Sequence, residues 1–193
     1  MIKFLIPLAT ALLFSACSLF PKSSPSTSEV LPNTSPSVST PSTKSTPAPL
    51  PTVITLKTKY GPIAIKLYLQ DAPNTTQNFI QKVNSGFYNK LKFHRVEPGF
   101  VVQGGDPLGN GTGGGKIASE INDIPFKRGS VGLARGQIKV ESNDSQFFIC
   151  LNDLNCQHLT SEYVNFGEVV SGMEFVDQIQ VGDQIIEMTP YTK

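Results

Sequence analysis

The amino-acid sequence changes character at residue 53, and this break limits what the chain can fold into more than any other feature. Of the 35 residues at 18–52, 24 are Ser, Thr or Pro, and no apolar periodicity is present. Such a segment buries too little apolar surface to offset the conformational entropy lost on ordering. We therefore predict a disordered tether at 18–52 and one folded domain at 53–193, whose length is typical of a single domain.

Residues 1–17 carry the marks of a secretory signal. Lys3 gives a positive start, residues 4–14 form an apolar run, and two small residues precede Cys17. This ending resembles the lipobox of bacterial lipoproteins, in which Cys17 is lipidated, although Phe14 stands where an aliphatic residue is usual. The alternative is an uncleaved membrane anchor, but the run is short against the ~20 apolar residues that a bilayer core requires. Both interpretations predict an extracytoplasmic domain, held at the outer face of a cell membrane or at an outer membrane.

The tether and the charge balance narrow the kinds of partner. A proline-rich chain of this length reaches on the order of 30 Å as a coil and about 110 Å when extended. We interpret it as a spacer; a glycosylated stalk and a proline-rich ligand are the alternatives. The net charge of +1 gives no support for nucleic acid as a partner.

Short strand-like segments dominate residues 53–193. Residues 53–57 and 63–69 flank a turn and predict a hairpin. Asp71 and Pro73 are typical of a helix start, with Asp71 as the cap, and apolar spacing predicts a second helix at 173–180. Further strands are expected at 92–96, 100–103, 130–134, 146–151, 164–169 and 185–188. Many short strands with two helices indicate a closed or nearly closed β structure whose open ends the helices cover.

One continuous motif points to a known family. Residues 93–106 read FHRVEPGFVVQGGD, which resembles the signature FHRxxPGFxxQGGD of cyclophilin-type peptidyl-prolyl cis-trans isomerases at every fixed position. The blocks NGTGG at 110–114, SQFFI at 145–149 and YVNFG at 163–167 follow in the family's order. The resemblance extends from residue 53 to the C-terminus. It implies a mostly β fold, a closed eight-stranded antiparallel β-barrel capped by two α-helices, acting as a monomer without cofactor or metal.

Prolyl isomerisation makes modest chemical demands on a site. The conjugated amide resists rotation with a barrier of about 18–20 kcal/mol, so catalysis requires tighter binding of the twisted amide than of either planar isomer. No nucleophile, metal or acid–base pair is needed. A fixed, forked guanidinium can donate a hydrogen bond to the prolyl nitrogen as its lone pair localises. The resemblance assigns this role to Arg95, with Phe100 and Gln103 as the other catalytic residues.

The resemblance also implies an apolar seat for the proline ring and polar contacts for the flanking carbonyl groups. Phe100, Phe148 and Leu159 form that seat in the family, and Gln103 and Gln146 supply the polar contacts. The expected substrate-binding residues beside the catalytic ones are Val101, Ala134, Arg135, Gln146, Phe148, His158, Leu159 and Tyr163.

Structural roles are the alternative for several of these side chains. Phe100 and Phe148 are also typical of plain core packing, and Arg95 is also typical of a surface salt bridge. Residues two apart on a strand share a face, so Arg95 and Glu97 face one way and His94 the other. We therefore expect His94 to be a structural histidine and not a catalytic one.

Three site residues depart from the family's usual pattern. Arg135 stands where the family commonly has Asn, which adds a second cation near the groove. His158 occupies the family's Trp position, which predicts weak cyclosporin binding. Tyr163 replaces a groove His, but its hydroxyl can still donate a hydrogen bond, so activity is expected to remain.

Cys150 and Cys156 are the two cysteines beyond Cys17. Outside the cytoplasm they are able to pair. Two free or buried thiols are the favoured expectation, and a disulfide is the alternative.

Three functions are compatible with these features. The first is an isomerase that accelerates folding of proline-containing extracytoplasmic clients, since uncatalysed isomerisation takes tens to hundreds of seconds. The second is a module that binds proline-containing segments without turnover, and the third is a structural lipoprotein. The combination of Arg95, Phe100, Gln103 and Phe148 favours the first.

Overall fold

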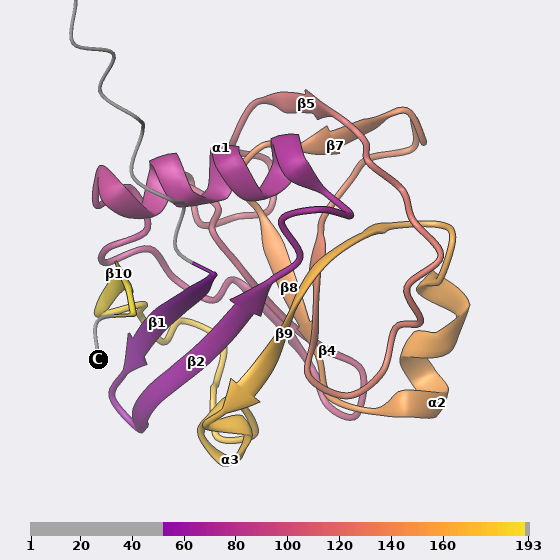
Figure 1. The fold of residues 1–193 in the computed structure, drawn as a ribbon. Coiled ribbons are helices and arrows are strands. Elements are labelled where there is room, and N and C mark those ends of the chain that lie inside the picture. The colour runs from indigo at the N-terminus through magenta and orange to yellow at the C-terminus, as the bar shows by residue number, and fades with distance from the viewer. Residues whose placement is uncertain (1–51, 192–193) are drawn as a thin grey trace, which may run out of the picture. The chain divides into compact units, whose positions relative to one another are not determined.

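The computed structural model describes residues 52–191, and one curled antiparallel sheet carries most of the fold (Figure 1). The predicted signal peptide at 1–17, with Cys17, and all but the last residue of the predicted tether lie outside the described residues. Eight strands pair in the order β10-β1-β2-β9-β6-β8-β4-β3. Their bounds are Val53–Thr58 (β1), Gly61–Leu67 (β2), Arg95–Glu97 (β3), Val101–Gly104 (β4), Ser130–Leu133 (β6), Phe147–Cys150 (β8), Val164–Ser171 (β9) and Glu187–Pro190 (β10). A separate pair joins β5 (Lys116–Ala118) to β7 (Glu141–Asn143).

The edge strands of the large sheet do not pair with each other. Within residues 52–191, β3 and β10 share no ladder. The segments that lead into them are joined instead, by a single bridge between Lys92 and Gln184 and by the Phe93 N–H, which donates to the Asp183 carbonyl at 2.8 Å. For this bridge to extend into a ladder with β3, the backbone at Gly182 would have to be extended. Gly182 instead has a φ of 93°, outside the β region, so the chain turns there. The mostly β prediction is confirmed, whereas a closed barrel is not confirmed.

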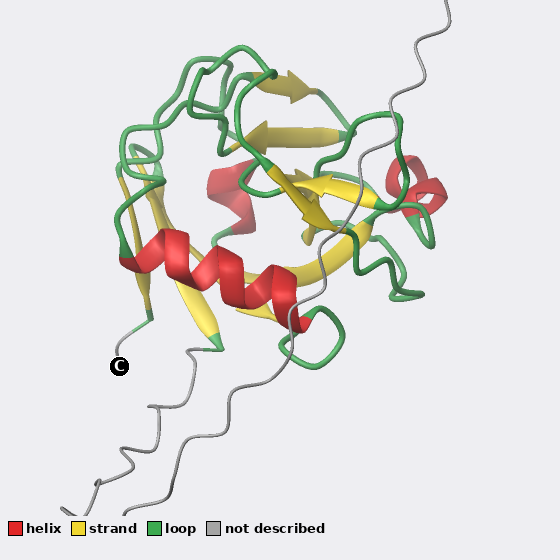
Figure 2. Cartoon of the chain, turned by 90° about the horizontal axis from the view of Figure 1, so that it is seen from above, coloured by secondary structure: helices red, strands yellow, loops and turns green. Residues whose placement is uncertain are grey.

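The first predicted helix is confirmed as α1 (Pro73–Asn84), which packs beside β10 and lies across one end of the curled sheet (Figure 2). Its buried positions include Phe79, Ile80 and Val83. The prediction that Asp71 caps it is wrong. The carboxylate of Glu120, distant in sequence, accepts the N–H of Asn74 at 3.0 Å and that of Thr75 at 2.7 Å, and thereby satisfies two orphan donors of the first turn.

The remaining helices are short. The helix predicted at 173–180 is confined to α3 (Met173–Val176), because the following N–H groups bond three residues back, as from Ile179 to the Val176 carbonyl at 3.2 Å. An unpredicted helix α2 (Asp153–Cys156) continues into the 3₁₀ turn η1 (Gln157–Leu159). Among residues 52–191, no helix combines the length and the apolar character that crossing a membrane requires.

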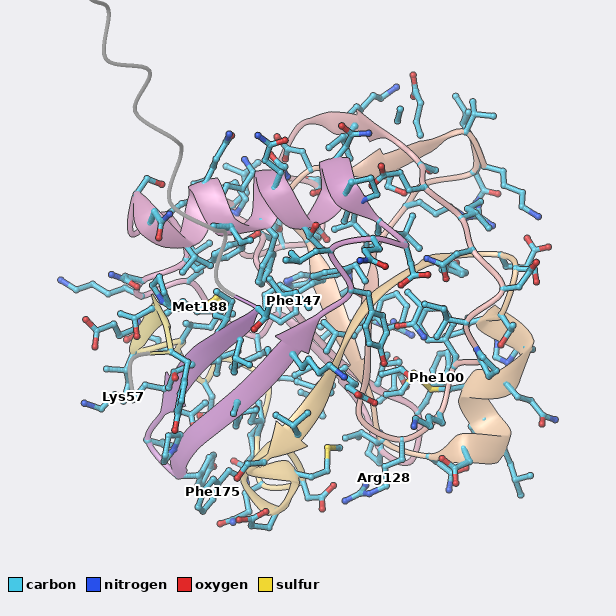
Figure 3. The ribbon with its side chains drawn as sticks, in the orientation of Figure 1. Lys57, Phe100, Arg128, Phe147, Phe175 and Met188 are labelled. Atoms are coloured by element: carbon cyan, nitrogen blue, oxygen red, sulfur yellow. A yellow bond between two sulfur atoms is a disulfide. The ribbon has the colours of Figure 1, made fainter. Side chains whose placement is uncertain are left out.

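Two apolar clusters lie on opposite faces of the sheet's β4–β8 region. The inner face carries the main core, where Phe147 is fully buried and packs edge-on against Phe79, with ring centroids 5.8 Å apart (Figure 3). The outer face carries a second, smaller cluster of Val101, Phe126, Phe148, Cys150, Cys156 and Leu159, with Phe100 and Tyr163 packed against it. This outer cluster is the floor on which the candidate site is built.

Candidate active site

The register of the sheet places the chemically important residues in one row. Arg95 on β3 pairs with Gln103 on β4, Gln103 pairs with Phe148 on β8, and Phe148 pairs with Gly132 on β6. Directly paired residues of antiparallel strands point to the same face. A cation, an amide and an aromatic ring therefore share the outer face, while alternate residues such as Val102 enter the main core.

A tight turn brings Phe100 to this row. Pro98 and Gly99 are the central residues of the β3–β4 turn, and the Phe100 N–H donates to the Glu97 carbonyl at 2.9 Å. Gly99 has a φ of 72°, which the third residue of a type II turn requires and which glycine adopts without strain. The turn holds the Phe100 ring beside the Arg95 guanidinium, 5.8 Å from the ring centroid.

These residues surround a pocket of about 330 Å³. Its lining consists of Arg95, Phe100, Val101, Gln103, Ala134, Arg135, Phe148, His158, Leu159 and Tyr163. The structure thus brings together every predicted catalytic and substrate-binding residue except Gln146. That side chain is only 3% exposed and lies behind Gln103.

A relay of side-chain amides orients the cation. Arg95 Nη1 donates to Gln103 Oε1 at 3.2 Å, and Gln103 Nε2 donates to Gln146 Oε1 at 3.0 Å. Gln146 Nε2 in turn donates to the Gly113 carbonyl at 2.8 Å. Gln146 therefore positions Gln103, and Gln103 positions the guanidinium. The Arg95–Glu97 ion pair, at 3.5 Å between exposed side chains, contributes little by comparison.

Gly113, which accepts the last hydrogen bond of this relay, belongs to a glycine-rich loop at 109–115. Asp106 stabilises this loop. Its carboxylate accepts the backbone N–H groups of Leu108 at 2.9 Å and Asn110 at 2.8 Å, and also that of Gly111. Burial alone would raise the pKa of Asp106, but these donors stabilise the carboxylate and hold the pKa below its ordinary value. Asp106, the last residue of the motif, therefore supports the loop that lies behind Gln146 and Gln103.

The apolar seat is built around the Phe148 ring. Phe126 stacks on one side, with ring centroids 5.6 Å apart, and Tyr163 packs edge-on at 5.7 Å. Gly132 makes room for this arrangement, because a Cβ there would lie under 3.0 Å from ring atoms of both Phe148 and Phe126. Leu159 adds a further buried apolar wall. Aromatic and aliphatic side chains therefore form an apolar seat within the pocket.

His94 is not among the pocket-lining residues, as the strand alternation predicts. Both of its ring nitrogens are buried and have no hydrogen-bond partner within residues 52–191. Burial lowers the pKa of His94, so the ring favours its neutral form. The structure places His94 outside the pocket, and its structural role stays a prediction.

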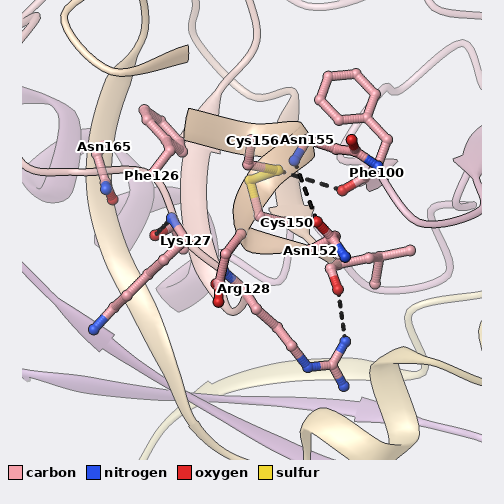
Figure 4. Close-up of a disulfide and its surroundings, with 12 residues drawn as sticks. Phe100, Phe126, Lys127, Arg128, Cys150, Asn152, Asn155, Cys156 and Asn165 are labelled. Atoms are coloured by element: carbon pink, nitrogen blue, oxygen red, sulfur yellow. Dashed lines mark hydrogen bonds between the residues drawn. A yellow bond between two sulfur atoms is a disulfide. The ribbon is translucent and has the colours of Figure 1, made fainter. Parts of the chain in front are cut away.

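The favoured expectation of two free or buried thiols is wrong: Cys150 and Cys156 form a disulfide in this structure, with Cα atoms 6.2 Å apart (Figure 4). The sequence did not predict α2, and that helix turns Cys156 back toward the end of β8. Asn155 adds a second attachment, since its Nδ2 donates to the Gly99 carbonyl at 2.9 Å. Together the two links fasten α2 and η1, and hence Leu159, beside the pocket.

Breaking this disulfide is expected to lower the free energy of unfolding by about 2 kcal/mol, because the crosslink restricts the unfolded chain. The effect lies at the low end of the usual range because the closed loop is short, and loop-closure entropy grows with loop length. The measurement is urea denaturation of the oxidised protein with and without dithiothreitol. The double variant Cys150→Ser, Cys156→Ser is the control and should not respond to reductant. Two titratable thiols in the protein isolated without reductant would contradict the assignment.

Some of the site lay beyond sequence reasoning. Phe126 supports Phe148 from an irregular segment, and only its place directly after Pro125 distinguishes it. Gly132 gave no motif signal, although a glycine within a predicted strand often marks a close approach. Neither β5 nor β7, which pair with each other, was among the strands predicted from the sequence.

Comparisons with known proteins agree with this geometry. Residues 53–192 match the family model described as cyclophilin type peptidyl-prolyl cis-trans isomerase/CLD. A peptidyl-prolyl cis-trans isomerase of Helicobacter pylori is 43% identical over 144 residues, which cover 72% of this chain and 85% of the relative. Peptidyl-prolyl cis-trans isomerase B of Bacillus subtilis is 40% identical over 128 residues, 65% of this chain and 88% of the relative.

A solved structure is similar in fold. The crystal structure of a Cryptosporidium parvum cyclophilin-type isomerase, determined in the presence of the dipeptide Ala-Pro, superimposes with a TM-score of 0.67 at 28% identity. The match covers 73% of this chain and 99% of that structure.

Proposed function

Because this chain belongs to the cyclophilin-type peptidyl-prolyl cis-trans isomerase family, we propose that its pocket isomerises Xaa-Pro bonds of extracytoplasmic clients by a non-covalent mechanism in which Arg95 stabilises the twisted amide. Isomerase activity is the family's activity, and the mechanism and setting are the proposal. The observation that carries it is the convergence of Arg95 and the Phe100–Phe148 seat on one pocket.

The mechanism follows from what each wall can do. The apolar seat fixes the prolyl ring while the preceding part of the client rotates about the amide bond. As the amide twists, the nitrogen lone pair loses conjugation and becomes a hydrogen-bond acceptor. The Arg95 guanidinium, pre-oriented by Gln103, donates to it, and this interaction exists in neither planar isomer. Such differential binding lowers the barrier.

The substrate class is a proline-containing polypeptide. The relative from Cryptosporidium was crystallised in the presence of Ala-Pro, a minimal Xaa-Pro unit. The pocket is an open surface groove and therefore admits a chain that continues on both sides of the proline. We expect the protein to act as a monomer, since the pocket is complete within residues 52–191.

Magnetisation-exchange NMR on an Xaa-Pro peptide tests the activity. Catalytic amounts of the full chain should accelerate cis–trans exchange, which takes tens to hundreds of seconds without catalyst. Peptide binding without any acceleration would instead support a binding module and reject the proposed function.

The location is proposed from the first 17 residues alone. The apolar run before Ser15, Ala16 and Cys17 supports export and lipidation of Cys17, with the Ser/Thr/Pro-rich tether as a spacer. The protein would then sit on the cell membrane's outer face or in an outer membrane.

Substitution of Cys17 tests this location. When cells are grown with labelled palmitate, the wild-type protein should become labelled and should be recovered in the membrane fraction. The Cys17→Ser variant should carry no label. Ser18→Ala is the matched control and should be labelled normally. Equal labelling of wild type and Cys17→Ser would contradict lipidation at this residue.

A further inference from the structure

The pocket is lined by two positive charges. Its lining includes two guanidinium groups, Arg95 and Arg135, and no Asp or Glu. The mechanism uses only Arg95. We propose that Arg135 is a specificity-determining residue that makes the enzyme favour clients with a carboxylate side chain next to the proline. This inference rests on the proposed function of the same pocket.

The Arg135 side chain is held in a fixed orientation. Its Nε donates to the Glu162 carbonyl at 3.0 Å, and Nη1 donates to the Gly136 carbonyl at 3.0 Å. The guanidinium carbon lies 4.6 Å from the centroid of the Tyr163 ring, in a cation–π contact. Since these contacts restrict the rotamer, the entropic cost of ordering this long side chain has been met before a client binds.

The guanidinium keeps capacity for a further acceptor. Of its five N–H donors, three have an acceptor within residues 52–191, and the third, Nη2 to Glu162 Oε2, is long at 3.4 Å. Glu162 is held more closely by Lys139, whose Nζ lies 2.8 Å from Oε1. The hydrogen bond from Lys139 is also the main reason that the pKa of Glu162 falls below its ordinary value. Glu162 therefore has a second partner when a client carboxylate approaches Arg135.

Partial burial makes this cation selective. The Arg135 side chain is 14% exposed, against 42% for Arg95, so solvent screens its interactions less. A forked guanidinium can receive a carboxylate with two hydrogen bonds. We expect about a fivefold preference for a client with Glu over one with Gln, which corresponds to the upper range of ion pairs that remain partly solvated.

The experiment compares two sets of proline peptides. In one set the residue directly before proline is Glu, Gln or Lys, and in the other the same residues directly follow proline. For each peptide, kcat/KM of the full chain is measured by NMR exchange, which avoids the sequence preference of a coupling protease. The expected result is about a fivefold Glu:Gln ratio in at least one set, with Lys slowest, and a fall toward one at about 1 M salt.

Three variants assign the ratio to Arg135. Arg135→Gln should bring the Glu:Gln ratio to about one, and Glu162→Gln should raise it, because a competing carboxylate is removed. Lys57→Gln is the matched control: it also removes one positive charge, but from an exposed position on β1, on the far side of the molecule from Phe100 (Figure 3), and should leave the ratio unchanged.

The outcomes separate this inference from the proposed function. Active wild type with a ratio of one in both sets overturns the selectivity and leaves the isomerase function standing. The selectivity proposal is also overturned if the Glu:Gln ratio is unchanged in Arg135→Gln, or if it falls as much in Lys57→Gln as in Arg135→Gln. In either case the charge preference would not come from Arg135. Lack of turnover of every peptide overturns both.

Discussion

Replacing Arg95 with Ala is expected to lower kcat/KM for prolyl isomerisation by about 100-fold, the loss typical when a pre-oriented donor to a developing lone pair or charge is removed. The side chain is partly exposed and its ion pair with Glu97 lies at the surface, so the free energy of unfolding should change by less than about 1 kcal/mol. The measurement is NMR exchange on one Xaa-Pro peptide together with urea denaturation of both proteins.

Two further variants sharpen this result. Arg95→Lys keeps the charge but loses the fork that bonds Gln103 and the client at once, so it should recover only part of the activity. Glu97→Gln removes the surface ion pair without touching the pocket and should behave as wild type. If the activity of Arg95→Ala stayed within about threefold of wild type, the apolar seat would account for catalysis without Arg95, and the proposed role of Arg95 would be wrong.

Gly132→Ala is expected to damage the seat from beneath. The added Cβ would meet ring atoms of both Phe148 and Phe126 at under 3.0 Å. Those two rings stack on each other, and Phe148 also packs edge-on against Tyr163, so neither ring can yield without disturbing the other. Overpacking of this kind costs about 1–3 kcal/mol of stability. Displacement of the Phe148 ring by about 1 Å should also lower kcat/KM by roughly 10- to 100-fold.

Gly136→Ala is the matched control for this substitution. A Cβ at Gly136 meets no atom within 4 Å, so the variant should keep both the stability and the activity of wild type. Denaturation and NMR exchange are measured on both variants. If Gly132→Ala and Gly136→Ala behave alike, the proposed support of Phe148 by Gly132 is wrong.

The sequence was most informative where a local rule and a long motif agreed. Strand alternation predicted that Arg95 faces away from His94, and the structure keeps His94 outside the pocket that Arg95 lines. The resemblance supplied Gln103, and the register of β3 with β4 pairs it with Arg95. The turn at Pro98 and Gly99 lies in the gap between the predicted strands at 92–96 and 100–103. The position of Phe148 beside them was expected from the resemblance and results from the pairing of β4 with β8.

Long-range packing is the part that the sequence could not provide. Glu120 caps α1 by accepting the N–H groups of Asn74 and Thr75, which lie 46 and 45 positions away in the sequence. No local sequence signal connects residues so far apart. The Cys150–Cys156 pairing depends on α2, a four-residue helix too short for a periodic pattern. Phe126 reaches the seat from an irregular segment, so neither strand nor helix periodicity could place it.

The central claim is that Arg95 binds the twisted amide and not the planar client. Lineshape NMR during titration of one Xaa-Pro peptide with wild type and with Arg95→Ala measures the Kd and the exchange rate of the bound peptide separately. The account predicts that bound-state exchange falls about 100-fold while the Kd changes by no more than about fivefold. A Kd weakened by the full 100-fold, with bound-state exchange unchanged, would contradict it.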